Sequence, residues 1–181
     1  MKLVAFDLYG TLLDMSGIAD PGLLVPWRKA QLELTWTLNQ EGRFEPFDQV
    51  TRRALDQVAP GLSAAEAERL CAAWLTLPAF PEVAPTLQRL RAAGARTAIL
   101  SNGTRAMIES AVGAAGLPID DILSVEQVGV YKPDPRVYAL LPREGTLFVS
   151  ANPFDAEGAR HAGLTVCAID RAQGGTLDEV P

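Results

Sequence analysis

Short apolar runs alternate with amphipathic stretches along most of this chain. The apolar runs are rich in branched residues and are predicted as buried strands, over 2–8, 96–101, 146–150 and 164–169, with a weaker one near 122–125. Helical periodicity fills the stretches between them, at 82–93, 104–115, 134–141 and 155–162. This alternation predicts an α/β fold with a Rossmann-like, mainly parallel sheet.

One long stretch departs from the alternation. Residues 20–77 carry helical patterns and no strand pattern, with predicted helices over 22–40, 46–58 and 63–77. Ser63 and Glu66 have the spacing of a capping box. We therefore predict a small helical cap, residues 15–81, inserted into an α/β core made of residues 1–14 and 82–181.

Composition narrows the class of partner. Hydrophobic residues make up 48% of the 181 residues and the net charge is −6, which is typical of a globular protein with an acidic surface. Such a surface argues against nucleic acid and against a membrane as partners, whereas a locally positive pocket can still bind a small anion. No apolar run approaches a membrane span. Cys71 and Cys167 lack disulfide or zinc spacing, so we expect buried thiols and a cytoplasmic enzyme.

Polar side chains follow the predicted strands at the points where the strands end. Ligands of open α/β sheets bind beyond the carboxyl ends of the strands. We therefore expect groups far apart in the sequence to converge there, namely Asp7, Ser101, Asn102, Lys132, Ser150, Asn152 and Asp155.

Asp7 is the candidate nucleophile. A buried strand rarely ends in a carboxylate that has neither a partner nor a chemical role. Gly10 permits a tight turn, and Thr11 can hydrogen-bond the carboxylate and fix its rotamer. The alternative for this segment alone is an Asx-turn or a helix N-cap.

Four motifs together resemble those of the haloacid dehalogenase superfamily. They are Asp7-x-Tyr9-Gly10-Thr11, Leu100-Ser101-Asn102-Gly103-Thr104, the stretch 131–138 around Lys132-Pro133-Asp134, and 149–155 ending in Asn152-Pro153-Phe154-Asp155. The resemblance implies a Rossmann-like core, an aspartate nucleophile and a covalent aspartyl intermediate.

The motifs favour one branch of that superfamily. Its magnesium phosphatases carry a second aspartate two residues after the nucleophile, which protonates the leaving alkoxide; here that position is Tyr9. The fourth motif supplies a single acid, Asp155, so a magnesium site is incomplete. A halide leaves without a proton. The pattern thus resembles the L-2-haloacid dehalogenases, and we expect no metal and no cofactor.

The predicted cap carries further candidates. Arg28, Leu32 and Thr35 share one helical face, and the resemblance implies that Arg28 holds the halide while Leu32 and Phe47 line the pocket. The alternative is a solvated arginine with Phe47 in the core of the cap. Lys29 is expected to add positive charge near the halide.

The resemblance also distributes the remaining roles. Lys132 is expected to pair with Asp7 and Asp155. The substrate carboxylate is expected to be bound by backbone N–H groups near Leu8 and Tyr9, with Ser101 and Lys132. Asn102 is expected at the halide, with Ser150, Asn152 and Asp155 positioning Asp7, Lys132 and water. Tyr138 and Phe154 are expected at the substrate, whereas His161 is predicted to lie on the surface.

We therefore predict a metal-independent hydrolase that converts short L-2-haloacids to D-2-hydroxy acids through an ester on Asp7. The alternatives are a magnesium-dependent phosphatase and a degenerate member of low activity. Relatives suggest a homodimer. Relatives also usually continue past the position of Pro181, so we expect a smaller sheet, a trimmed chain or an edge covered by a partner.

Overall fold

A five-stranded parallel sheet forms the centre of the computed structural model, which describes residues 2–181 apart from the side chain of Glu179. The strand order is β3-β2-β1-β4-β5. Every pairing is parallel. The bounds are β1 Leu3–Phe6, β2 Arg96–Ser101, β3 Asp121–Ser124, β4 Thr146–Ser150 and β5 Thr165–Ala168. The predicted Rossmann-like sheet is confirmed, including its weak strand near 122.

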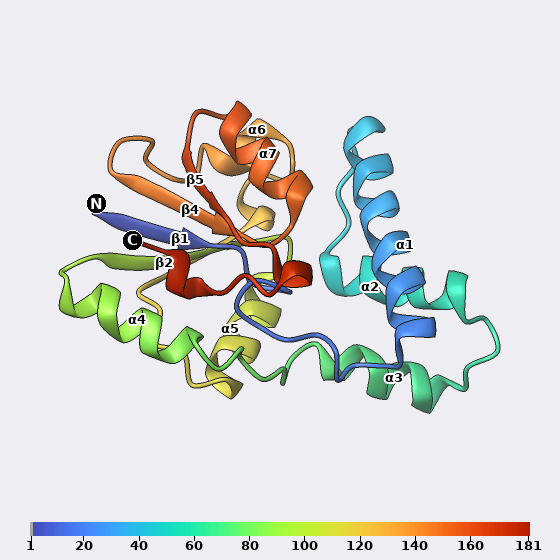
Figure 1. The fold of residues 1–181 in the computed structure, drawn as a ribbon. Coiled ribbons are helices and arrows are strands. Elements are labelled where there is room, and N and C mark those ends of the chain that lie inside the picture. Colours follow the sequence, from blue (N-terminus) through green and yellow to red (C-terminus); the bar gives the residue numbers. More distant parts are fainter. Residues whose placement is uncertain (1) are drawn as a thin grey trace.

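Helices cover both faces of this sheet. Helices α4 (Val83–Ala92) and α5 (Arg105–Ala114) lie on one face, and α6 (Pro135–Tyr138) and α7 (Pro153–His161) on the other (Figure 1). The central strands are therefore buried on both sides, which is why β1 and β4 read as continuous apolar runs rather than alternating ones.

Two helices are shorter than the periodicity predicts. Helix α6 is a single turn instead of 134–141, and α3 (Ala64–Ala73) ends before residue 77. A proline follows each predicted helix, Pro142 and Pro78, and disfavours helical backbone at the last predicted residue, Leu141 and Leu77. The apolar periodicity continues into turns that still pack on the core.

Three helices lie beside the sheet rather than on it. They are α1 (Pro21–Gln40), α2 (Phe47–Val58) and α3, and they form a separate group next to the carboxyl ends of the strands (Figure 1). Asp20 caps α1 by accepting a hydrogen bond from Gly22 N at 2.9 Å, and Ser63 and Glu66 form the predicted capping box of α3.

The two connections to this helical group run side by side. Leu13 pairs with Ala79 in an isolated antiparallel bridge, and Phe80 N donates to Leu12 O at 3.0 Å. The group is thus tied to the sheet through one narrow, hydrogen-bonded neck. The exact division into 1–14 with 82–181 and 15–81 stays a prediction, and its residue 1 lies outside the described residues.

The strand order fixes where a site can form. The chain moves from β1 outward to β2 and β3, then crosses to β4 and β5 on the other side of β1. The carboxyl ends of β1 and β4 therefore flank the point where the winding reverses, the usual ligand position in such sheets. Asp7 directly follows β1, and Ser150 ends β4.

Two smaller findings complete the comparison with the sequence. Cys71 and Cys167 do not form a disulfide and are only partly buried, so the expectation of buried thiols is wrong. No helix within residues 2–181 is long and apolar enough to cross a membrane.

Candidate active site

A buried lysine lies between two carboxylates at the carboxyl ends of β1 and β4. Lys132 Nζ is 3.0 Å from Asp7 Oδ1 and 2.9 Å from Asp155 Oδ2, and its side chain is 2% exposed. One ammonium group therefore compensates two carboxylates that lie far apart in the sequence. Buried charges are tolerated only with such pairing.

In this cluster, burial and the opposite charges of neighbouring groups shift the pKa values of Lys132 and Asp155 in opposite directions. Burial alone would lower the pKa of Lys132, but the carboxylates of Asp155 and Asp7 outweigh it and the pKa is raised. Burial raises the pKa of Asp155, and Lys132 opposes that shift only in part. The lysine therefore stays protonated, while Asp155 depends on Lys132 for its charge.

The carboxylate of Asp7 is held asymmetrically. Its Oδ2 accepts from Thr11 Oγ1 at 2.8 Å and from Asn152 Nδ2 at 2.6 Å, whereas its Oδ1 accepts from Lys132 alone among the described residues. Thr11 is itself fixed, because its hydroxyl accepts from Ala151 N at 2.9 Å. The carboxylate is thus locked in one rotamer with Oδ1 as the less engaged oxygen.

Asp155 forms the back wall of the cluster. Its Oδ2 accepts from Ser150 Oγ at 2.8 Å as well as from Lys132, and its Oδ1 accepts from Tyr138 Oη at 2.8 Å. Ser150 also accepts from Asn152 N at 3.1 Å. These bonds connect the end of β4 and the start of α7 into one rigid network.

The loop after β2 supplies the opposite wall. Asn102 Oδ1 accepts from Lys132 N at 3.0 Å, which aligns the loop that carries the lysine. Because the oxygen of this amide is engaged, its NH₂ group is the part that can face a ligand. Ser101 is 1% exposed and its hydroxyl accepts from Gly103 N at 3.1 Å.

These groups surround a partly enclosed cavity of about 20 Å³, a volume that suits about one water molecule. The helical group contributes the guanidinium of Arg28 and the apolar side chains of Leu32 and Phe47 to its wall. The lining residues are Asp7, Tyr9, Arg28, Leu32, Phe47, Ser101, Asn102, Lys132, Asn152 and Phe154. The structure thus brings ten of the predicted site residues to one cavity.

The other predicted site residues lie behind the lining. Thr11, Ser150 and Asp155 hold the groups that face the cavity, and Tyr138 contacts Asp155 rather than the cavity. The Leu8 side chain is fully buried in the core, so its predicted contribution, a backbone N–H, stays a prediction.

Tyr9 has an unusual environment. It is 4% exposed, packs edge-on against Trp74 at 5.3 Å between ring centroids, and its hydroxyl has no hydrogen-bond partner among the described residues. Burial raises the pKa of this phenol, so it is a neutral donor at physiological pH. The position that holds an acid in the superfamily's phosphatases therefore holds no carboxylate here.

Lys29 does not line the cavity, so the expectation that it adds positive charge there is wrong. Its side chain is 75% exposed and pairs with Glu33 at 3.7 Å. A helix turns by about 100° per residue, so the neighbour of the inward-facing Arg28 points to solvent. Arg28 alone contributes a positive charge from α1 to the cavity wall.

The sequence analysis did not identify the residues that orient the part of the site contributed by the helical group. Gln31 hydrogen-bonds Arg28, and Asn39 forms two hydrogen bonds with the backbone of Tyr131, the neighbour of Lys132. The i, i+3 spacing from Arg28 to Gln31 was a usable signal. The contact from Asn39 to Tyr131 spans two distant segments and had no local signal.

No three His, Cys, Asp or Glu side chains within residues 2–181 converge as a ligand set for a metal ion. The expected independence from metals stays a prediction.

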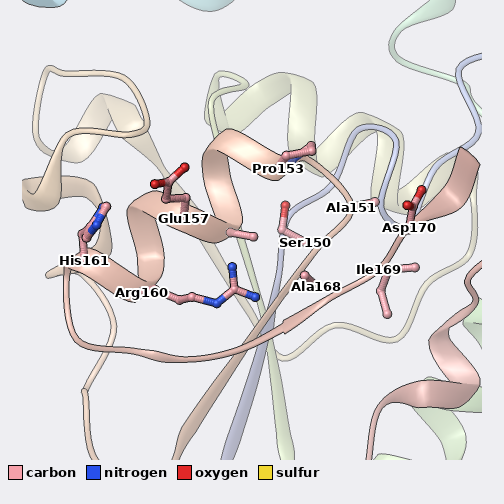
Figure 2. Close-up of a pocket in the computed structure, with 10 residues that line it drawn as sticks. Ser150, Ala151, Pro153, Glu157, Arg160, His161, Ala168, Ile169 and Asp170 are labelled. Carbon is pink, nitrogen blue, oxygen red and sulfur yellow. The ribbon is translucent and has the colours of Figure 1, made fainter.

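A larger hollow lies elsewhere on the surface. A groove of about 600 Å³ runs between α7 and the edge strand β5. Figure 2 shows Arg160 reaching from α7 toward Ala168, with His161 at the rim. Of the predicted site residues only Ser150 borders it, and its hydroxyl is engaged with Asp155. His161 is exposed, as predicted.

Comparison with known proteins matches this arrangement. The family model of haloacid dehalogenase-like hydrolases matches residues 1–163. The chain is 41% identical to (S)-2-haloacid dehalogenase H-109 of Pseudomonas putida, over 98% of this chain and 88% of that protein. It is also 41% identical to the (S)-2-haloacid dehalogenase of Pseudomonas sp. (strain YL), over 99% and 87%.

Solved structures agree with the sequence matches. L-2-haloacid dehalogenase from Xanthobacter autotrophicus, with chloropropionic acid covalently bound, superposes with a TM-score of 0.87 at 35% identity, over 94% of this chain and 78% of that one. The match of the family model over most of the chain and the two relatives above 40% identity lead to one conclusion: the chain belongs to the haloacid dehalogenase-like hydrolase family.

Proposed function

We propose that this protein hydrolyses short L-2-haloacids to D-2-hydroxy acids, with Asp7 as the nucleophile. The observation that carries the proposal is the small cavity that Asp7 lines together with Arg28 and Asn102, with Tyr9 and not a carboxylate at position 9. The named activity of the relatives and the covalently bound chloropropionic acid in one of them support it.

In the first step, Asp7 Oδ1 attacks C2 of the substrate from the side opposite the halogen. The C2–halogen bond breaks as the C2–O bond forms, so the configuration inverts and the halide keeps the bonding electrons. Arg28 and the NH₂ group of Asn102 stabilise the departing anion. No proton is needed by this leaving group, in accord with a neutral phenol at Tyr9.

The substrate carboxylate needs its own donors. Ser101, at the end of β2, is proposed to bind it together with the N–H groups of Leu8 and Tyr9, which lie in the loop after β1. Leu32, Phe47 and Phe154 supply apolar walls that exclude water from the reacting carbon. Positioning and fixed dipoles then provide most of the rate acceleration.

In the second step, water attacks the carbonyl carbon of the Asp7 ester. The acyl C–O bond breaks, Asp7 is regenerated as a carboxylate, and the product leaves as the hydroxy acid with release of one proton. Asp155 and Lys132 are proposed to orient this water, and Asn152 to stabilise the charge on the carbonyl oxygen, because it already binds Asp7 Oδ2 at 2.6 Å.

The helices over residues 15–81 act in this proposal as the cap that closes the site. A cytoplasmic location and a homodimer, both expected from the sequence, belong to the same proposal. Independence from metals follows from the chemistry, since a halide requires no electrophilic assistance beyond hydrogen-bond donors.

The deciding experiment measures halide release from L- and D-2-chloropropionate, with EDTA or with magnesium. We expect release from the L-isomer only, indifference to EDTA, and loss of activity in Asp7→Asn. The matched control is Asp56→Asn, a carboxylate on α2 that is 57% exposed. Magnesium-dependent hydrolysis of a phosphate ester without halide release would establish the phosphatase alternative instead.

A further inference from the structure

The guanidinium of Arg28 is anchored by one side chain. Arg28 Nη1 donates to Gln31 Oε1 at 2.9 Å, one turn further along α1. Within the described part of the chain this is the only side-chain hydrogen bond of Arg28, whose guanidinium also lies 5.4 Å from the centroid of the Trp74 ring. The direction of the guanidinium toward the cavity therefore depends on Gln31.

Gln31 is itself held from the opposite side. It is fully buried, and its Nε2 donates to Thr51 Oγ1 at 2.8 Å on α2. Thr51 O in turn accepts from Trp27 Nε1 at 2.8 Å. A guanidinium only donates hydrogen bonds, so the amide must present oxygen to Arg28 and NH₂ to Thr51. Both ends of the amide are satisfied in only this orientation.

The neutrality of this anchor has a chemical consequence. A carboxylate at position 31 would hold Arg28 equally well but would neutralise its charge. An amide fixes the guanidinium and leaves its full positive charge for an anion in the cavity. We propose that Gln31 is a positioning residue that holds Arg28 for the departing halide while preserving its charge, an inference that rests on the function proposed above.

Two substitutions separate position from charge. Gln31→Met keeps the volume and removes the anchor; we expect kcat/KM for L-2-chloropropionate to fall roughly ten- to a hundredfold, from the usual strength of a hydrogen bond to a charged group. Inhibition by added bromide should weaken by a similar factor. Gln31→Glu keeps the anchor and offsets the charge, so bromide inhibition should weaken although Arg28 remains fixed.

A readout independent of turnover is the ¹⁵N NMR signal of the Arg28 side chain, with sodium bromide titrated in. We expect an anchored guanidinium, with restricted rotation, in wild type and Gln31→Glu, and a freely rotating one in Gln31→Met. Bromide should bind wild type more tightly than either variant. If wild type releases no halide, the proposed function fails, whereas the bromide titration still decides the role of Gln31.

Control variants distinguish a positioning role of Gln31 from a merely structural one. Gln40→Met lies on the exposed end of the same helix and should match wild type in all assays. Thr51→Val, which loosens the amide from behind, should weaken bromide inhibition less than Gln31→Met and should add little to it. The proposal is overturned if Gln31→Met lowers only the melting temperature and leaves KM, kcat, bromide binding and the Arg28 signal unchanged.

Discussion

Replacing Lys132 by methionine should destabilise the fold by an amount that depends on pH. The side chain is 2% exposed between Asp7 and Asp155, which are 10% and 1% exposed. Methionine fills nearly the same volume, so the loss is mainly electrostatic. At an effective dielectric constant of about 20, the attraction across 2.9 Å between Lys132 and Asp155 is about 6 kcal/mol.

The variant can avoid part of that loss by binding a proton. Protonating an ordinary aspartate, of pKa about 3.9, costs about 4.2 kcal/mol at pH 7 and about 1.5 kcal/mol at pH 5. Both are smaller than the lost attraction, so Asp155 of the folded variant should be protonated. The folded state then holds one more proton than the unfolded state, and the destabilisation grows by about 1.4 kcal/mol per pH unit above pH 4.

Urea unfolding of wild type and Lys132→Met at pH 5 and pH 7 measures the loss of unfolding free energy at each pH. We expect a loss of about 4 kcal/mol at pH 7 and about 1.5 kcal/mol at pH 5. Adding Asp155→Asn should recover most of the loss at pH 7 and flatten its pH dependence. Lys29→Met, on an exposed lysine, is the control. Equal losses at the two pH values would refute the reasoning.

Three further predictions concern the groups around this cluster. Asn39→Ala removes both hydrogen bonds to the backbone of Tyr131, at 2.8 and 2.9 Å; it should cost about 1–3 kcal/mol in thermal unfolding and speed hydrogen exchange at the Tyr131 amide. Unchanged exchange would contradict it. Gly158→Ala places a Cβ 2.7 Å from Tyr138 Oη and should cost about 1–3 kcal/mol while lowering kcat, measured by unfolding and halide release. A fully active, stable variant would show that the helix can shift. Because burial raises the pKa of Asp155, the acid limb of kcat/KM should lie above the pH typical of an aspartate, and a limb at or below that pH would count against an ionised Asp155 in catalysis.

The sequence was sufficient for the core because its signals are local. The apolar runs of β1 and β4 and the turn residues after them identify buried strands, and parallel order follows from the helices between them. Convergence of Asp7, Lys132 and Asp155 then follows from topology. The motif resemblance added the chemistry, which periodicity alone does not specify.

The features that the sequence did not predict depend on helix geometry and tertiary packing. Helix α6 ends at Tyr138, although the apolar pattern continues to Leu141, where the following Pro142 disfavours helical backbone. Lys29 follows Arg28 in the sequence, but the rotation of a helix by about 100° per residue points its side chain to solvent. Gln31 and Asn39 act through contacts between helices or between the cap and the core, and pairs of this kind depend on tertiary packing.

The size of the cavity determines what the cap must do in a reaction cycle. A volume of about 20 Å³ holds one water, whereas a 2-haloacid has at least five non-hydrogen atoms, so the described arrangement is the closed one. In the proposed mechanism, substrate entry would therefore require the helices over residues 15–81 to separate from the sheet. This separation would break the contact of Trp36 with Phe154, at 6.0 Å between ring centroids, and the hydrogen bonds of Asn39 with Tyr131. Tyr131 immediately precedes Lys132, so the segment that releases the cap also carries the lysine. In the proposed mechanism, closing the cap and fixing Lys132 would thus be one event, and water would be excluded at the moment Asp7 is ready to react.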